Sequence, residues 1–263
     1  MELDPKGQRV LITGGSSGIG AALAERLATA GAIVGITGRD QVRLDSVLQR
    51  CRAHVQQCRS WAVDLADPAQ VDDLANRALD ELGGVDVVIN NAGVPKRKHV
   101  TLLDPTTVET ITRVNYLAPV QLTLALLPHM LERGSGRIVN VSSVAATLSS
   151  PGEAAYDGSK AALAVFSEAM AVDLWDTGIK VLVVYPGVVD TPLFEVPDND
   201  PMTDEIARIP VSDLVDAVMD ALDRGLAEVY VPDWFKGIVA DKAKDVDAFL
   251  AGTAEWVRSH QVG

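Results

Sequence analysis

The segment Arg9–Thr13 (RVLIT) runs directly into the glycine-rich stretch Thr13–Gly20 (TGGSSGIG), and an amphipathic pattern follows it. The first run is mostly apolar and predicts a buried strand. Glycines let the backbone turn sharply and approach a ligand closely. A helix N-terminus then presents unpaired N–H groups and a positive dipole to an anion. The stretch therefore predicts a strand–turn–helix unit, which either binds a phosphate group or is simply a tight turn.

The spacing of the glycines is G-x3-G-x-G, which differs from the G-x-G-x-x-G of the usual dinucleotide fingerprint. It also differs from the Walker A loop, because no Lys-Ser/Thr pair follows Gly20. The position after the first strand and before a helix is the context that a dinucleotide site requires. That context favours binding of a pyrophosphate.

Further apolar, β-branched runs recur along the chain, and they are nearly continuous rather than alternating. Such runs are typical of strands buried on both faces of a parallel sheet. Helical patterns lie between them. The alternation predicts a single α/β domain over residues 1–263, a doubly wound Rossmann-type parallel sheet of about seven strands with helices on both faces. The predicted strands are Arg9–Thr13, Ala32–Thr37, Ser60–Val63, Val85–Asn90, Arg137–Ser142, Lys180–Tyr185 and Glu228–Val231.

Two segments stand apart from this alternation. Residues 192–210 are acidic and hold four of the 13 prolines, which predicts a long loop or lid beside the substrate. Residues 232–263 are rich in apolar side chains and are expected to form a C-terminal helical extension. Three locations are open to this extension: the substrate crevice, a second subunit or a membrane surface. Its interleaved acidic residues argue against an anionic membrane.

Composition limits the partners. The chain has 23 basic and 36 acidic residues, a net charge of −13, whereas nucleic-acid binding needs an excess of basic charge. An anionic membrane is disfavoured for the same reason. The first residues lack the apolar core of a signal peptide, and no apolar run approaches the roughly 20 residues that span a bilayer. We therefore expect a cytoplasmic protein that binds neither nucleic acid nor membrane.

Cysteines and histidines predict neither a disulfide framework nor a metal site. Cys51 and Cys58 form no CxxC pair and are expected to be free thiols. The four histidines are scattered, with no HxH or HExxH pair. We therefore expect no metal.

The end of the second predicted strand, Thr37-Gly38-Arg39-Asp40, bears on which dinucleotide is bound. An NAD site places an acidic residue on the ribose about 20 residues after the glycines, whereas an NADP site places an arginine near the 2′-phosphate. Counting from Gly20 reaches Asp40, which favours NAD unless Asp40 caps the helix Gln41–Cys51. We favour NADP(H), with Arg39 as the phosphate contact, because basic charge beside a dianion discriminates more strongly. NAD(H) stays open.

Tyr156 and Lys160 are four residues apart within Ala154–Trp175, a segment whose pattern predicts a helix. Their side chains would share one face. An ammonium group near a phenol stabilises phenolate and lowers the tyrosine pKa from about 10. Tyr156 would then be a usable general acid or base near neutral pH. Alone, such a pair is also common on exposed helix surfaces.

Other polar groups come directly after predicted strands. Ser142-Ser143, the stretch Asn90-Asn91-Ala92-Gly93 and Pro186-Gly187 all do so, and Asn115 lies in a following helical segment. Ligands bind at the carboxyl ends of the strands in open parallel sheets. These groups are therefore expected to converge on one crevice.

Together, TGGSSGIG, NNAG, YDGSK and PGVVDTP, with a serine 13 residues before the tyrosine, resemble the short-chain dehydrogenase/reductase family. The resemblance covers roughly Arg9 to Pro192, and the motifs occur in the family's order. It implies a nicotinamide cofactor, a small-molecule carbonyl or alcohol substrate, and a homodimer or homotetramer. The subunits would meet through the helix that carries Tyr156 and its neighbour.

The resemblance also implies roles for single residues. Tyr156 corresponds to the catalytic acid/base, Lys160 to the residue that lowers its pKa and binds the nicotinamide ribose, and Ser143 to the residue that orients the substrate carbonyl. Asn115 corresponds to the asparagine that holds a water in the proton relay. Besides Tyr156 and Lys160, the expected cofactor contacts are Gly14, Ser16, Ser17, Gly18, Ile19, Gly20, Arg39, Asp64, Leu65, Asn91, Ala92, Gly93, Pro186, Gly187, Val189 and Thr191.

Some of these assignments have alternatives. Ser142 competes with Ser143, although the spacing to the tyrosine favours Ser143. Asp64, which resembles the adenine-contacting aspartate, could instead cap the helix that begins near Pro68. Asn90 could be only a turn residue.

Asp157 and Gly158 depart from the family pattern, which more often has small residues such as Ser and Ala there. Gly158 weakens the helix slightly. Asp157 is expected to point away from Tyr156. If it faced Tyr156, it would raise the tyrosine pKa.

The substrate pocket is less defined. It is expected near Val94–His99, Val144–Glu153 and the 192–210 loop. The basic run Lys96–Lys98 favours either an anionic substrate or a solvated loop tip. Apolar side chains predict a lipophilic ketone or alcohol. The candidate substrate contacts are Val144, Leu148, Val188, Leu193 and Phe194, with Val94 and Met202 nearby.

The expected function is NADP(H)-dependent interconversion of a ketone or aldehyde and a secondary alcohol. An NAD-dependent alcohol dehydrogenase is one alternative, and an enoyl reductase would need a wider Tyr–Lys spacing. A non-catalytic NAD(P)-binding redox sensor is the alternative from another class. The set Asn115, Ser143, Tyr156 and Lys160 argues against the sensor, because binding alone requires no proton relay.

Overall fold

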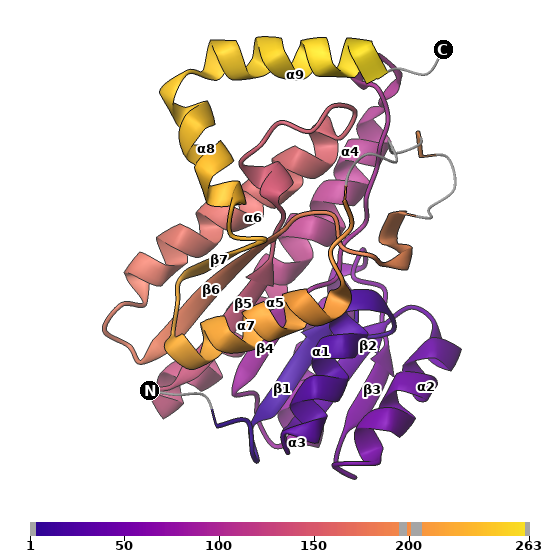
Figure 1. The fold of residues 1–263 in the computed structure, drawn as a ribbon. Coiled ribbons are helices and arrows are strands. Elements are labelled where there is room, and N and C mark those ends of the chain that lie inside the picture. Colours follow the sequence, from indigo (N-terminus) through magenta and orange to yellow (C-terminus); the bar gives the residue numbers. More distant parts are fainter. Residues whose placement is uncertain (1–3, 195–198, 201–206, 261–263) are drawn as a thin grey trace.

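Seven parallel strands form one sheet in the order β3-β2-β1-β4-β5-β6-β7 (Figure 1), which confirms the predicted fold class. The computed structural model describes residues 4–194, 199–200 and 207–260, without the side chains of Phe194 and His260. The predicted strands are all present, with ends that differ by one or two residues. Their bounds are β1 Arg9–Thr13, β2 Ile33–Gly38, β3 Arg59–Ala62, β4 Val87–Asn90, β5 Gly136–Val141, β6 Ile179–Pro186 and β7 Glu228–Val231.

Helices cover both faces of the sheet. Side chains of α1, α2 and α7 form one core layer with it, and those of α3, α5 and α6 form the other. The helical elements are α1 Gly18–Thr29, α2 Gln41–Arg52, α3 Pro68–Leu82, η1 Val100–Leu102, α4 Pro105–Thr112, η2 Arg113–Leu117, α5 Ala118–Arg133, η3 Val144–Ala146, α6 Ala154–Asp173, η4 Pro192–Phe194, α7 Val211–Arg224, α8 Phe235–Lys244 and α9 Val246–His260.

Burial on both faces explains the unbroken apolar runs. In β1, Val10 and Ile12 belong to one core layer, whereas Leu11 belongs to the other. In β4, Val88 likewise faces the layer opposite to its neighbours. Successive strand residues point to opposite faces, so a strand with two buried faces needs an apolar residue at every position.

The strand order reverses between β1 and β4, because β2 and β3 extend to one side of β1 and β4–β7 to the other. In open parallel sheets, ligands bind at such a switch point, beyond the carboxyl ends of the strands. Thr13 and Asn90 end these two strands. The TGGSSGIG and NNAG stretches therefore meet at this crevice.

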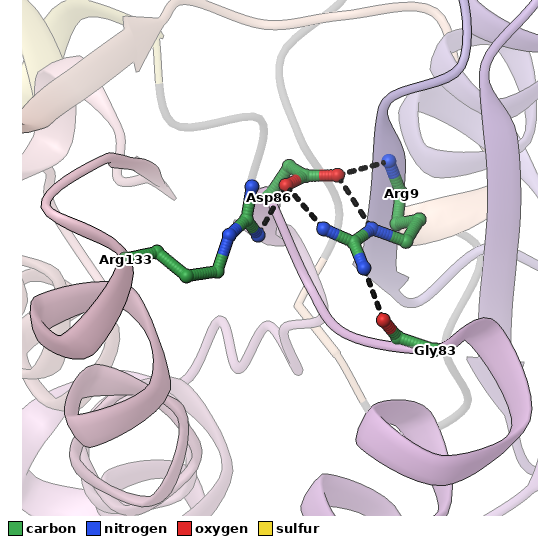
Figure 2. A network of polar contacts seen from close by, with 4 residues as sticks. All are labelled: Arg9, Gly83, Asp86 and Arg133. Atoms are coloured by element: carbon green, nitrogen blue, oxygen red, sulfur yellow. Dashed lines mark hydrogen bonds and ion pairs between the residues drawn. The ribbon is translucent and has the colours of Figure 1, made fainter.

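An ionic network lies at the opposite end of the central strands, where β1 and β4 begin (Figure 2). The Asp86 carboxylate accepts hydrogen bonds from the backbone N, Nε and Nη2 of Arg9, each 2.8 Å long, and pairs with Arg133 at the end of α5. Arg9 also donates to the carbonyl of Gly83. The Asp86 side chain is only 8% exposed. This network joins the start of β1 to β4, α3 and α5.

The C-terminal extension forms α8 and α9 and crosses the carboxyl-end side of the molecule (Figure 1). Phe235 of α8 packs against Gly187, where a Cβ atom would lie 2.6 Å from the ring. No helix in the part of the chain that the structure describes is long and apolar enough to cross a membrane. Within the expected 192–210 loop, residues 195–198 and 201–206, Met202 included, lie outside the described residues.

Candidate active site

The glycine turn between β1 and α1 is packed so tightly that two of its glycines are required. Gly14 has φ +68°, and a Cβ there would lie 2.8 Å from Cα of Ala92. A Cβ on Gly20 would collide with the carbonyl oxygen of Gly14. Gly20 thus packs the helix against the turn and does not line the cavity, contrary to its expected role as a cofactor contact.

The NNAG stretch holds this turn in place. Asn91 Nδ2 donates to the carbonyl oxygens of Thr13 (3.0 Å) and Gly14 (3.2 Å). Thr13 Oγ1 in return accepts from the backbone N–H groups of Asn91 and Ala92. Asn90 is not a turn residue: it ends β4, is buried, and its Nδ2 donates to Thr123 Oγ1 and Asn140 Oδ1.

Helix α1 differs from its neighbours at its N-terminus. Asp40, Asp67 and Asp104 cap α2, α3 and α4 by accepting backbone N–H bonds. At α1 the capping residue Ser17 makes no side-chain cap bond, and the first turn holds no acidic residue. The first N–H groups of a helix need acceptors, and Ser17, Gly18 and Ile19 line a cavity of about 820 Å³. This terminus fits the pyrophosphate of a dinucleotide.

Basic charge lies at the end of β2. Arg39 lines the cavity, and so does Arg43 of α2, which the sequence analysis did not single out. Asp40 is turned to the helix: its carboxylate accepts from the backbone N–H of Arg43 (3.1 Å) and pairs with the Arg43 guanidinium (3.3 Å). Asp40 thus has the capping role considered as an alternative, and Asp67, not Asp64, caps α3.

Tyr156, Lys160 and Ser143 meet in the cavity near the start of α6. Lys160 is buried, and its Nζ lies 5.8 Å from the centroid of the Tyr156 ring. That Nζ donates to the carbonyl oxygen of Val141 (2.8 Å). Ser143 caps η3, and its side chain is hydrogen-bonded to Tyr156. Ser142, its rival, instead donates to the backbone carbonyl of Lys160 (2.9 Å).

The Tyr156 pKa is raised, whereas the sequence predicts that Lys160 lowers it. Burial raises it well above its usual range, the charge of Glu153 raises it further, and the hydrogen bond with Ser143 only partly opposes this. Burial also lowers the Lys160 pKa to about 8. The expected lowering of the tyrosine pKa by Lys160 was therefore wrong for this structure, because desolvation penalises both charged forms.

Asn115 lies in the π-helical turn η2, and its side chain is fully buried. Its Oδ1 accepts from Val94 N (2.8 Å), while its Nδ2 donates to Val94 O (3.0 Å) and Ser159 Oγ (3.0 Å). Asn115 is not among the cavity-lining residues. Its amide thus fixes the chain after NNAG against α6, and its expected role in holding a water of the proton relay stays a prediction.

Asp157 turns away from the cavity. Its carboxylate accepts from the backbone N–H of Ser150 (2.7 Å) and so fixes the loop before α6. Burial raises the Asp157 pKa to about 7. Its charge is the smallest of the contributions to the raised Tyr156 pKa.

The basic run after NNAG is neither a solvated tip nor a free anion site. Arg97 and Glu153 form an ion pair of 2.5 Å, each side chain 14% exposed, and both line the cavity. The Arg97 backbone bonds Asn199 and Asp200, and Lys98 Nζ lies 3.9 Å from the Asp200 carboxylate. This run therefore ties together the two loops that flank the substrate end of the cavity.

Most predicted contacts line the cavity. The exceptions are Gly20, Asn115 and Leu148. The Leu148 backbone N–H donates to Val144 O and closes the turn after η3. The Phe194 side chain lies outside the described residues. Predicted contacts on the cavity wall are Gly14, Ser16, Ser17, Gly18, Ile19, Arg39, Asp64, Leu65, Asn91, Ala92, Gly93, Ser143, Val144, Tyr156, Lys160, Pro186, Gly187, Val188, Val189, Thr191 and Leu193.

Sequence reasoning did not single out Arg43 as a wall residue. Glu153 lies at the end of the Val144–Glu153 range expected near the substrate, and one face of α9 lines the cavity, which is one of the three locations left open for the C-terminal extension. Arg43 follows Arg39 by one helical turn, a spacing that could have indicated it. No local pattern links α9, about 100 residues downstream of Tyr156, to this cavity.

Comparison with known proteins agrees with this geometry. The family model for short chain dehydrogenases matches residues 8–201. A short chain dehydrogenase of Pseudocercospora fijiensis is 37% identical over 191 residues, which are 72% of this chain and 62% of that protein. A fatty acyl-CoA reductase of Acinetobacter baylyi is 36% identical over 190 residues, 72% of this chain and 64% of its own. The chain thus spans less than two thirds of the length of each of these two relatives.

Among solved structures, a short-chain dehydrogenase from Sphingobium yanoikuyae in complex with NADPH aligns with a TM-score of 0.81 and 30% identity. The alignment covers 97% of this chain and 98% of that one. The protein therefore belongs to the short-chain dehydrogenase family. It is an NAD(P)-dependent oxidoreductase.

Proposed function

We propose that this oxidoreductase interconverts a ketone or aldehyde and a secondary alcohol, with NADP(H) as its cofactor. One observation carries the proposal. The cavity that begins at the uncapped N-terminus of α1 continues to Tyr156, which is hydrogen-bonded to Ser143 and lies beside Lys160. A proton donor and a site for a nicotinamide dinucleotide thus share one space.

In reduction, Ser143 would orient the carbonyl by donating a hydrogen bond to its oxygen. Tyr156 would donate its phenolic proton to the oxygen as negative charge develops there. Lys160, held by the Val141 carbonyl, would keep positive charge beside the ring. The bound nicotinamide supplies the hydride. These roles assign the proton transfer to Tyr156, which lines the cavity.

The raised pKa of Tyr156 favours reduction as the direction. A phenol with a raised pKa keeps its proton at neutral pH and therefore serves as a general acid. Oxidation would first require removal of that proton. Glu153, whose charge raises the Tyr156 pKa, supports the same direction.

The preference for NADP(H) is supported by Arg39 and Arg43, which both line the cavity beyond β2. Asp40, which NAD recognition would require in the cavity, is engaged with Arg43. The Sphingobium relative was solved with NADPH. Two arginines can contact a 2′-phosphate by charge-assisted bonds.

Replacing Arg39 by glutamine tests this preference. Hydrogen bonds to charged groups contribute roughly 1.5–3 kcal/mol, so the Kd for NADPH should rise about 10- to 150-fold. The Kd for NADH should stay within about twofold. Arg50→Gln is the control, because Arg50 lies on α2, the helix that follows Arg39, but pairs with Glu25. Equal weakening of both cofactors, or tighter wild-type binding of NADH than of NADPH, would contradict the proposal.

The substrate we propose is lipophilic. Val144, Val188 and Leu193 line the cavity near Tyr156. The Acinetobacter relative is by name a fatty acyl-CoA reductase.

We also propose a homo-oligomer formed through α5 and α6. Exposed leucines recur at intervals of seven residues along α5 and its approach, and exposed valines do so on α6. Exposed apolar patches mark interfaces. The residues are Leu117, Leu124, Leu131, Val165 and Val172.

The double variant Leu124→Lys, Val172→Lys should convert this oligomer into monomers, because it places buried charges at the interface. Sedimentation velocity measures the change. Val42→Lys is the control, since Val42 is 79% exposed on α2, away from α5 and α6. A wild-type protein that sediments as a monomer would refute the expectation.

A further inference from the structure

Helix α9 presents one face to the cavity. Phe249, Thr253, Trp256 and Val257 line it, and their spacing of four, three and one residues defines a single helical stripe. Three of these side chains are half-buried, while Trp256 is 38% exposed at the rim. Leu250 borders this stripe beside Val257, but it is 44% exposed and does not line the cavity.

A lysine of α8 fixes this helix to the substrate end of the cavity. Lys242 Nζ donates to Thr147 O (2.7 Å) and Ser149 Oγ (3.2 Å), in the loop between Ser143 and Tyr156. The same Nζ lies 5.7 Å from the centroid of the Phe249 ring. The start of α9 is therefore held beside the loop that joins Ser143 to Tyr156.

The stripe is apolar except for one hydroxyl. Thr253 Oγ1 donates to Phe249 O within the helix (2.9 Å), so the hydroxyl is already satisfied. No acidic or basic side chain of α9 lines the cavity among the described residues. This wall can therefore contact hydrocarbon without leaving a buried polar donor unpaired.

The family model ends at residue 201. Both α8 and α9 lie beyond it, so this wall lies outside the part of the chain that the family model matches.

We propose that the α9 stripe is a specificity-determining wall that binds the hydrocarbon part of an elongated, uncharged carbonyl or alcohol substrate. The carbonyl end of that substrate lies at Tyr156, and its chain runs along Phe249 and Thr253 towards Val257. This inference deepens the proposed function and rests on it. Because each buried methylene improves binding about fourfold, affinity should rise steeply with chain length until the wall is covered.

The test is calorimetric binding of 2-butanol and 2-octanol, to the protein alone and to the protein saturated with NADPH. Alcohol and NADPH are both reduced, so no turnover occurs. Wild type should bind 2-octanol at least tenfold more tightly than 2-butanol. Phe249→Ala removes the largest half-buried side chain of the stripe, and Thr253→Trp narrows the cavity in front of the stripe. Leu250→Ala is the matched control, because Leu250 lies on the same helix but does not line the cavity.

Both stripe variants should bring the ratio of the two affinities close to one, while the affinity for 2-butanol stays within about twofold and Leu250→Ala behaves as wild type. Wild type that binds neither alcohol, or a ratio unchanged in both Phe249→Ala and Thr253→Trp, overturns the inference. Turnover of 2-butanone and 2-octanone with NADPH is measured separately. If no ketone is reduced but the binding ratios change as expected, the proposed function fails and the α9 wall stands.

Discussion

Replacing Tyr156 with phenylalanine should lower kcat for carbonyl reduction by about 10²–10⁴-fold, the usual contribution of general acid catalysis. Phenylalanine keeps the ring and the packing of the start of α6 but removes the only atom that donates the proton. The Kd for NADPH should change by less than about threefold, because the α1 terminus and the arginines at the end of β2 are untouched. Steady-state kinetics and NADPH fluorescence measure the two quantities.

Tyr116→Phe is the matched control. Tyr116 lies in η2, packs edge-on against Phe166 with ring centroids 6.2 Å apart, and does not line the cavity. Its variant should keep wild-type turnover. Near-normal turnover in Tyr156→Phe would exclude Tyr156 as the acid. If Tyr156→Phe lost both NADPH binding and turnover, Tyr156 would instead have a structural role.

The second large effect is on stability. Asp86→Asn should lower the free energy of unfolding by about 3 kcal/mol at pH 7, because removing one member of a buried ionic network leaves its partners uncompensated. We expect the lower end of the usual range, since Arg9 and Arg133 are 22% and 33% exposed. For a chain of this size the Tm should fall by about 6–12 °C in calorimetry.

The loss of stability in Asp86→Asn should become smaller as the pH falls. Burial would raise the Asp86 pKa, but hydrogen bonds from Arg9 and Arg133 outweigh it and lower the pKa to about 2. A lowered carboxyl pKa stabilises the fold above the unfolded pKa of about 4, and this stabilisation is lost as the pH falls towards 2. The difference in Tm between wild type and Asp86→Asn should therefore be largest at neutral pH and shrink below pH 4.

Asp73→Asn is the control for the stability measurement. Its carboxylate is 64% exposed and 3.8 Å from Arg77, so its loss should cost less than about 1 kcal/mol. Equal effects of the two variants, or a difference in Tm that grows as the pH falls, would contradict the role given to Asp86.

The sheet could be predicted from sequence because burial on both faces requires an apolar residue at nearly every position of a strand. In β1, each of Val10, Leu11 and Ile12 is buried, and the run is apolar throughout. The cofactor turn was also predictable, since Gly14 occupies a backbone conformation and a space that exclude a side chain. Local steric demands of this kind restrict the residue type at a position.

The parts that could not be predicted depend on contacts between distant segments. Asn115 was identified by its motif, yet its amide is engaged by Val94, 21 residues earlier. The Tyr156 pKa depends on burial that spacing to Lys160 does not reveal. Glu153 reaches the cavity as the partner of Arg97, and α9 reaches it through Lys242. Such contacts follow from the assembled fold and leave no periodic pattern.

The central claim is tested most directly by following deuterium from NADPH, labelled on its reactive ring carbon, into a ketone such as 2-octanone. We predict that wild type and Tyr116→Phe form 2-octanol with one deuterium on the carbinol carbon, and that Tyr156→Phe forms almost none. Mass spectrometry of the alcohol gives the answer. Tight binding of NADPH with no labelled alcohol from any ketone or aldehyde of a broad panel would contradict the account and favour a protein that only senses the redox state of its cofactor.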